Sequence, residues 1–475
     1  MPSSKKNEFS KLEQLKNEGK FKEASALLNE LEREKGLLLQ DHLEIHHLKS
    51  FLLIELGDIN EALKYAKLAY KESLQLKNKF KIVDILFTMR KAFVMDGREN
   101  KALETIIKAE KILNTINQTS SLEFKEKIGY LNLNKSRYYF DMGDFNRSLT
   151  HADEVLAIAK EIKNKKLMMF TARIFALNYA LKGNHDRAHE YRKKYLTLAS
   201  ELNDKQETIS ALYIIGTSLI EKGDFDQALV YLEQSLSLCD EINSWKKIPV
   251  LSNLCELYIN TNSFDKAQKC LNQMKQFRDQ TNFKISNSFY SLTKAMILKS
   301  KSQEIDLLKA KQILKQIVDE ERPFVGLLYP ALVELCDLYL LDLFKTNNLK
   351  ALDEIQPIIS KLMDIAKDQK SFWLLVEVYS LKAKLKLMTF EFEEAQNLLR
   401  QSMDIAKKHS LIHIAQRISS EQDELQNQKN KWETLRRSKA LMAERMDLAR
   451  VDEQIVRMLR KRVYLEKKLN LGDFI

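Results

Sequence analysis

Three pairs of histidines stand four residues apart, a spacing that places both rings of a pair on one face of a helix. Such a pair can hold zinc or nickel from one side, but a tetrahedral zinc site usually takes a third protein ligand. The chain has no Cys-x-x-Cys and no His-Glu-x-x-His motif that would supply one. We therefore predict no metal at these pairs, which are His42/His46, His185/His189 and His409/His413.

Motifs of catalysis are also missing from the chain. It contains no glycine-rich phosphate loop and no Gly-x-Ser-x-Gly motif. The four cysteines fall on apolar positions of helical patterns without close pairing, so we expect reduced packing residues: Cys239, Cys255, Cys270 and Cys336. The sequence predicts a protein that is not an enzyme and needs no cofactor.

Charge and hydropathy indicate which classes of partner and which cellular location to expect. The chain has 77 basic and 66 acidic residues among 475, a mild net charge of +11. The basic residues alternate with acidic ones, which disfavours nucleic acid as a partner and leaves a nucleic-acid- or phosphate-binding role as a lesser alternative. No run of eighteen apolar residues exists to cross a membrane, and residues 1–6 lack the apolar stretch of a signal peptide. We expect a cytoplasmic protein.

A short turn motif recurs about every forty residues and predicts the elements that carry these side chains. A glycine ends one helix, and the following Asp or Asn caps the next with its side-chain oxygen. A small residue five positions after the glycine lets the two helices approach closely. A fixed period of this size is typical of repeat architectures. The copies start at Gly19, Gly57, Gly97, Gly143, Gly183, Gly223 and Asn262, and the small residues are Ala62, Ala102, Ser148, Ala188, Ala228 and Ala267.

The apolar pattern around Gly223 resembles the tetratricopeptide repeat, which residues 205–238 match almost position for position. The period of about forty is similar to the long-helix variety found in kinesin light chains and in bacterial and archaeal regulatory proteins. This resemblance implies an all-α fold, a right-handed α-α superhelical solenoid of about ten helical hairpins. We place the solenoid at 1–410, degenerate at 1–38 and 281–370, and a C-terminal helical segment at 411–475.

The C-terminal segment has a different composition, with no Gly or Pro from residue 419 to 469. Ile418, Leu425 and Trp432 are spaced by seven, as in a coiled coil, but the register slips at Lys439. Three alternatives follow for one long helix. It caps the last repeats, forms a homodimer through a coiled coil, or projects to bind a partner.

The resemblance also implies that the first helix of each hairpin lines a concave groove. Lys91, Arg137 and Arg173 are the strongest candidates there, because a lone cation is costly to bury. We expect a partner peptide or helix with acidic residues, and we expect Arg137→Glu with Arg173→Glu to abolish its binding with stability nearly intact. Counting back from each turn selects His47, Phe51, Phe87, Lys91, Asn134, Arg137, Phe170, Arg173, Tyr213, Thr217 and Asn253.

The function that fits these features is a non-catalytic scaffold for protein–protein interaction, holding a peptide or helix in its groove. The alternative is a regulatory module, in which partner binding repositions the C-terminal helix. The residues do not name the partner.

Overall fold

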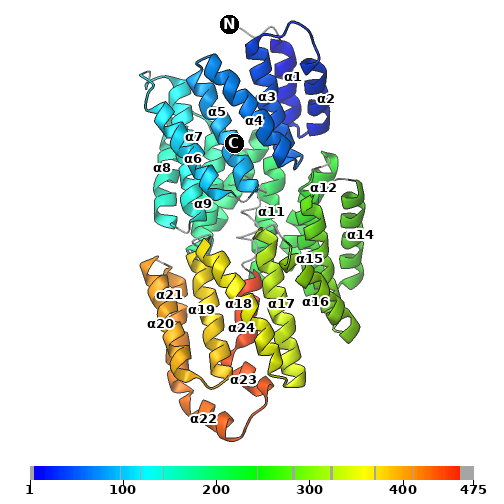
Figure 1. The fold of residues 1–475 in the computed structure, drawn as a ribbon, viewed down its shortest axis with the longest axis vertical. Helices are drawn as coiled ribbons and strands as arrows, with labels where there is room; N and C mark the ends of the chain where they lie inside the picture. The colour runs from blue at the N-terminus through cyan, green and yellow to red at the C-terminus, as the bar shows by residue number, and fades with distance from the viewer. Residues whose placement is uncertain are drawn as a thin grey trace.

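The computed structural model describes residues 5–96, 98–117, 119–142, 144–242, 244–280, 284–320, 325–368, 371–409 and 411–460. Within these ranges it holds 24 helices and no strands, which confirms the all-α superhelical solenoid (Figure 1). Among the described residues, no helix is both long and apolar enough to cross a membrane. Two copies of the turn glycine, Gly97 and Gly143, lie outside the described residues, as do tail residues 461–475.

Twenty of these helices pair into ten antiparallel hairpins, as the repeat predicts. The first five pairs are α1 (Lys6–Asn17) with α2 (Phe21–Glu32), α3 (Leu39–Glu55) with α4 (Ile59–Gln75), α5 (Lys79–Met95) with α6 (Glu99–Leu113), α7 (Leu122–Asp141) with α8 (Phe145–Glu161), and α9 (Lys165–Leu181) with α10 (His185–Glu201). The second five are α11 (Lys205–Lys222) with α12 (Phe225–Glu241), α13 (Lys247–Asn260) with α14 (Phe264–Gln280), α15 (Lys284–Ser300) with α16 (Glu304–Val318), α17 (Val325–Thr346) with α18 (Lys350–Asp368), and α19 (Phe372–Met388) with α20 (Phe392–Lys408).

The turn inside a hairpin has the conformation that its sequence predicts. Gly223 ends α11 with φ of +81°, a left-handed conformation that costs glycine little. The Asp224 carboxylate then accepts a hydrogen bond from the backbone N–H of Gln227, 3.3 Å away, and caps α12. The small residues after these turns are buried, with Ala228 fully excluded from solvent. The residue two positions after the start of the turn motif is not always buried, since Phe264, which follows Asn262 by two, is 39% exposed.

A second turn joins one hairpin to the next, and the sequence analysis did not predict it. Lys77, Lys163 and Asn203 adopt left-handed conformations there, with φ between 52° and 53°. The next residue in each case, Asn78, Asn164 or Asp204, caps the following helix through its side chain. The repeat thus carries two capped turns, and only the first is marked by glycine.

The C-terminal segment is not the single long helix that was predicted. It folds as α21 (Ile412–Asn427), α22 (Lys429–Arg437), α23 (Met442–Ala449) and α24 (Val451–Arg460). The chain reverses after α22, where Lys439 takes φ of +53°, so the register slip marks a turn. Helices α23 and α24 then pack on α17 and α19 (Figure 1).

The residues spaced by seven pack within the chain in this structure. The Trp432 side chain is 1% exposed, and its ring meets Phe390 and Phe392 edge to face at centroid distances of 6.4 Å and 6.0 Å. The apolar stripe of the described tail therefore has an intramolecular explanation. A homodimer through residues 411–475 stays a prediction.

Candidate functional site

The first six hairpins surround a cavity of about 280 Å³. Its wall comes mainly from odd-numbered helices, the first of each hairpin, which is the face that the repeat resemblance implies for ligand binding. The lining residues are Glu13, Lys16, Phe21, Glu44, His47, Leu48, Phe51, Glu55, Lys81, Asp84, Phe87, Thr88, Tyr130, Lys166, Asp204, Gln206 and Glu207.

Contact between the first and the sixth hairpin closes this cavity on one side. A β-carbon added at Gly19, in the α1–α2 turn, would lie 2.7 Å from Cδ1 of Ile242 and 3.2 Å from Nε2 of Gln206. These distances leave no room for a side chain, so the turn packs directly on the end of α12 and the start of α11. The superhelix therefore brings α1 back to α11, although about two hundred residues separate them.

Three of the eleven predicted groove residues line this cavity, namely His47, Phe51 and Phe87. The other eight do not line it and are buried. Phe170 and Tyr213 belong to the hydrophobic core, and the amide of Asn253 donates to the Tyr213 hydroxyl over 2.8 Å. Asn134 and Thr217 use their side chains on backbone carbonyls of their own helices.

The three predicted groove cations are also buried, and each has a carboxylate partner. Lys91 pairs with Glu55, Arg137 Nε lies 3.1 Å from Asp141 Oδ1, and Arg173 Nη1 lies 3.3 Å from Glu207 Oε2. The expectation that Arg137 and Arg173 face a ligand rested on the cost of a lone buried cation. That reasoning was wrong for these residues, because the carboxylates already compensate their charge.

Burial dominates the electrostatics of these pairs. It raises the pKa of Glu55 and of Glu207 above their usual value, against the opposing effects of Lys91 and Arg173. The hydroxyl of Tyr195 also donates to Glu207. Charge reversal at Arg173 would place two carboxylates together in the core, so it would test folding and not binding.

A cluster of lysines on the cavity wall was missed by the sequence analysis. Lys16 comes from α1, Lys81 from α5 and Lys166 from α9. Lys16 and Lys81 have carboxylate partners at 2.6 Å and 2.5 Å. Lys166 forms no ion pair with any described residue. Burial lowers the pKa of Lys16, and the nearby positive charge of Lys166 lowers it further. The wall position of Lys166 was missed because the groove offsets skip the first turn of each helix.

His47 lies within the same positive field. Its Nε2 is 2.9 Å from Oγ1 of Thr88. Burial, reinforced by Lys81 and Lys16, holds the pKa of His47 well below 6.5, so the ring is neutral near pH 7. Phe51 beside it is covered by two cations, with Lys16 Nζ and Lys91 Nζ 5.0 Å and 4.8 Å from its ring centre.

The histidine pairs and the cysteines do not come together as one site among the described residues. No three His, Cys, Asp or Glu side chains of the described residues are grouped as metal ligands. His46 instead bonds Glu72, at 2.9 Å from Nδ1 to Oε1, and His409 stacks on Phe372. The four cysteines are buried free thiols.

Comparison with protein families identifies the repeat. A sequence profile of the tetratricopeptide repeat matches residues 133–162, which cover α8 and the end of α7. The match covers one repeat unit of the all-α superhelical solenoid. A second profile, described as meiosis protein SPO22/ZIP4 like, matches residues 180–324 of this solenoid. No curated protein sequence matches the chain.

Three solved structures are among those that resemble this chain. A Rap protein complexed with competence and sporulation factor is 16% identical, with 77% of this chain and 98% of that chain covered and a TM-score of 0.52. The Rap conjugation gene regulator of plasmid pLS20 with the Phr* peptide is 13% identical, covering 69% and 96% at a TM-score of 0.48. Aspartyl phosphate phosphatase F from Bacillus subtilis is 16% identical, covering 77% and 94% at 0.42. At 16% identity, the likeness to the first of these supports the fold alone.

Proposed function

We propose that this protein is a non-catalytic interaction scaffold that holds a peptide segment in the cavity of its first six hairpins. The observation that carries the proposal is the cavity itself, which lies on the inner helices and whose wall includes Lys166, a lysine with no ion pair to any described residue. The Rap protein of similar fold is complexed with competence and sporulation factor, which supports a bound partner for this solenoid as well.

One lysine of the wall, Lys166, favours an acidic group on that peptide. Six carboxylates line the cavity against three lysines, but five of the six already have basic partners: Glu13, Glu44, Glu55, Asp84 and Glu207. The sixth, Asp204, accepts the backbone N–H of Glu207 as a helix cap. Asp204 and Lys166 are then the two wall charges without an ion pair to any described residue, and the acidic preference rests on Lys166 and not on Lys91, Arg137 or Arg173. A carboxylate beside it would also relieve its repulsion of Lys16.

A charge reversal on α9 tests this proposal with a neighbouring control. Peptides selected from a random display library against the full chain would be labelled and titrated by fluorescence anisotropy. We expect Lys166→Glu to weaken the selected peptides at least about tenfold, near 1.4 kcal/mol. Lys165→Glu is the control, because Lys165 is 58% exposed and pairs with Glu201 on the outer surface.

Two outcomes would refute the proposal. In one, the library yields no peptide that binds saturably to the full chain. In the other, Lys165→Glu and Lys166→Glu weaken the selected peptides equally, which would place the contact outside the cavity.

A further inference from the structure

The inner face of the ninth and tenth hairpins is occupied by the chain itself. We define the tail segment as residues 442–460, which form α23 and α24. Both helices pack on α17 and α19, the first helices of their hairpins (Figure 1). The tail segment therefore covers the kind of surface that lines the open cavity in the first six hairpins.

An apolar stripe of the tail segment faces this surface. Val451, Ile455 and Met458 are at most 1% exposed, and they stand at positions i, i+4 and i+7 of one helix. Val456, between them in sequence, is 43% exposed. This is the pattern of an amphipathic helix seated in a groove.

Two further contacts hold the backbone of the tail segment. The Tyr329 hydroxyl donates to the carbonyl of Met458 over 2.7 Å, and Lys384 Nζ donates to the carbonyl of Ala449 over 2.7 Å. The Ala449 carbonyl lies at the end of α23, where carbonyls lack intrahelical partners. The groove therefore provides donors that any helix of similar length can use, whatever its sequence.

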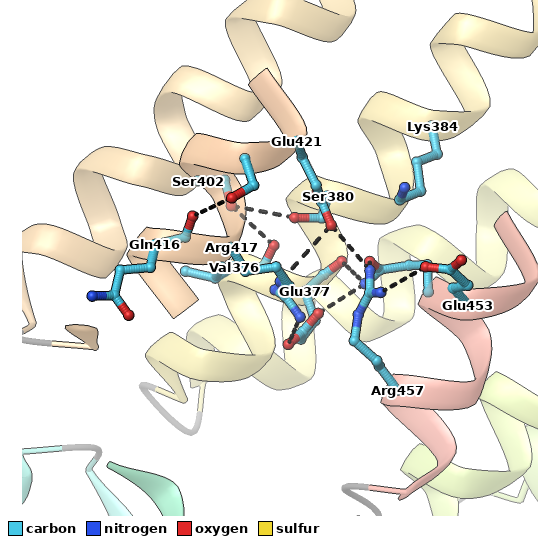
Figure 2. A network of polar contacts seen from close by, with 12 residues as sticks. Val376, Glu377, Ser380, Lys384, Ser402, Gln416, Arg417, Glu421, Glu453 and Arg457 are labelled. Carbon is cyan, nitrogen blue, oxygen red and sulfur yellow. Dashed lines mark hydrogen bonds and ion pairs between the residues drawn. The ribbon is translucent and has the colours of Figure 1, made fainter. Parts of the chain in front are cut away.

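Side-chain recognition comes from a network that Figure 2 shows between α19, α21 and α24. Gln454 is fully buried, and its Nε2 donates to the backbone carbonyl and the carboxylate of Glu377 at 3.1 Å and 2.9 Å. Arg457 Nη2 donates to Glu421 over 3.1 Å, while Arg417 donates to Glu377 over 3.0 Å. Counted from Val451 as position i, these contacts select a glutamine at i+3 and an arginine at i+6.

The network is incompletely satisfied with the tail segment in place. Three buried polar atoms on the groove side have no hydrogen-bond partner among the described residues: Arg417 Nε, Arg417 Nη2 and Glu421 Oε2. A buried polar atom without a partner costs about 1–3 kcal/mol. A partner helix that makes the same contacts and also offers an acceptor to Arg417 and a donor to Glu421 therefore binds the groove better than the tail segment does.

We propose that the groove of α17, α19 and α21 is a docking surface for an amphipathic helix of a partner protein, and that the tail segment is its resident competitor. The partner helix carries apolar residues at i, i+4 and i+7 with a glutamine at i+3 and a basic residue at i+6. The loop at 438–441 tethers the competitor, and Ser438 and Lys439 in it are exposed. This surface is separate from the cavity of the first six hairpins.

The test uses a fluorescein-labelled peptide of residues 440–460 as the probe, added to the full-length protein. In the wild type the tethered tail segment competes with the probe, so we expect weak binding. Ile455→Glu places a carboxylate on the buried stripe and disables the competitor, so we expect this variant to bind the probe at least about tenfold more tightly. Val456→Glu is the matched control on the exposed side of the same helix, and it should bind as the wild type does.

A second measurement covers the possibility that Ile455→Glu disturbs the repeats. A protease site inserted between Ser438 and Lys439 allows the tether to be cut in the folded protein. We expect the cut segment to dissociate on dilution and the probe to take its place. A probe that carries Ile455→Glu should not bind.

Three results would overturn the proposal. The first is a cut segment that stays bound and never exchanges with the probe, which would make it a structural part of the solenoid. The second is equal probe binding by Ile455→Glu and Val456→Glu. The third is a wild-type dimer, seen by sedimentation, that exchanges tail segments between copies, since the natural occupant would then be a second copy of the chain.

Discussion

Replacing Arg173 by methionine should destabilise the middle of the solenoid strongly. Arg173 is 4% exposed, and it faces Glu207, which is 1% exposed. The substitution keeps the size of the side chain roughly constant and removes its charge. Glu207 would retain the Tyr195 hydroxyl and the field of Lys246, but it would lose its largest source of electrostatic stabilisation.

The expected cost follows from leaving a buried charge without its partner, which is about 3–5 kcal/mol. The double variant Arg173→Met with Glu207→Gln should recover most of this loss, because it removes both charges. On the same helix, Lys165→Met breaks an exposed pair at 2.9 Å and should cost about 1 kcal/mol or less.

The cost should also depend on pH in a defined direction. Without Arg173, burial raises the pKa of Glu207 further above its ordinary value of 4.5. The folded state then binds a proton more readily than the unfolded state, so stability increases as pH falls from 7 toward 4.5. The deficit of Arg173→Met should therefore shrink at pH 5.

Hydrogen exchange measured by mass spectrometry is the suitable assay, because repeat solenoids open unit by unit. Peptides from α9, α10 and α11 should exchange faster in Arg173→Met, and peptides from α17 and α18 should not. Wild-type exchange in α9–α11 at pH 7, or a double variant no more stable than the single one, would refute the assignment of a buried ion pair.

Three other outcomes follow from the structure. Because the pKa of His47 is well below 6.5 in the folded state, the unfolded state binds a proton that the folded state does not. The free energy of unfolding should therefore fall below pH 6.5, by up to about 1.4 kcal/mol per pH unit. In a series of urea denaturations at different pH, the free energy of unfolding of His47→Gln should depend less on pH. Gly216→Ala should cost about 1–3 kcal/mol in denaturant titrations, because its Cβ would lie 2.7 Å from Leu232 Cγ; an unchanged midpoint would contradict the α11–α12 packing. Ala228→Glu should lower the melting temperature markedly, since Ala228 is fully buried, and a wild-type melting curve would mean that the repeat register is wrong.

The hairpins could be predicted from the sequence because their determinants are local. Gly223, Asp224 and Ala228 lie within six residues of one another, and each acts on its own turn or on the adjoining helix. Capping and left-handed φ values depend on residue type at short range, so a repeated motif predicts a repeated hairpin. The turns between hairpins were not predicted because Lys77 and Lys163 adopt a left-handed backbone there, and lysine, unlike glycine, has no preference for that conformation.

The candidate site depends on distances that accumulate over many hairpins. Three of the residues that the offsets select, His47, Phe51 and Phe87, line the cavity. The offsets could not show that Arg173 meets Glu207, 34 residues away. Nor could they bring Lys166 of the fifth hairpin near Lys16 of the first. Those encounters depend on the curvature of the superhelix, which sums small packing angles between neighbouring hairpins.

The C-terminal tail also shows which features depend on local sequence and which depend on tertiary packing. The sequence by itself determined that residues 411–460 form amphipathic helix and that regular spacing fails at Lys439. Only the tertiary structure decided that the chain turns back there and seats Ile455 against α17 and α19. An apolar stripe specifies that a helix must be covered, but the covering surface is chosen by shape and by buried partners such as Glu377, which lies 77 residues from Gln454.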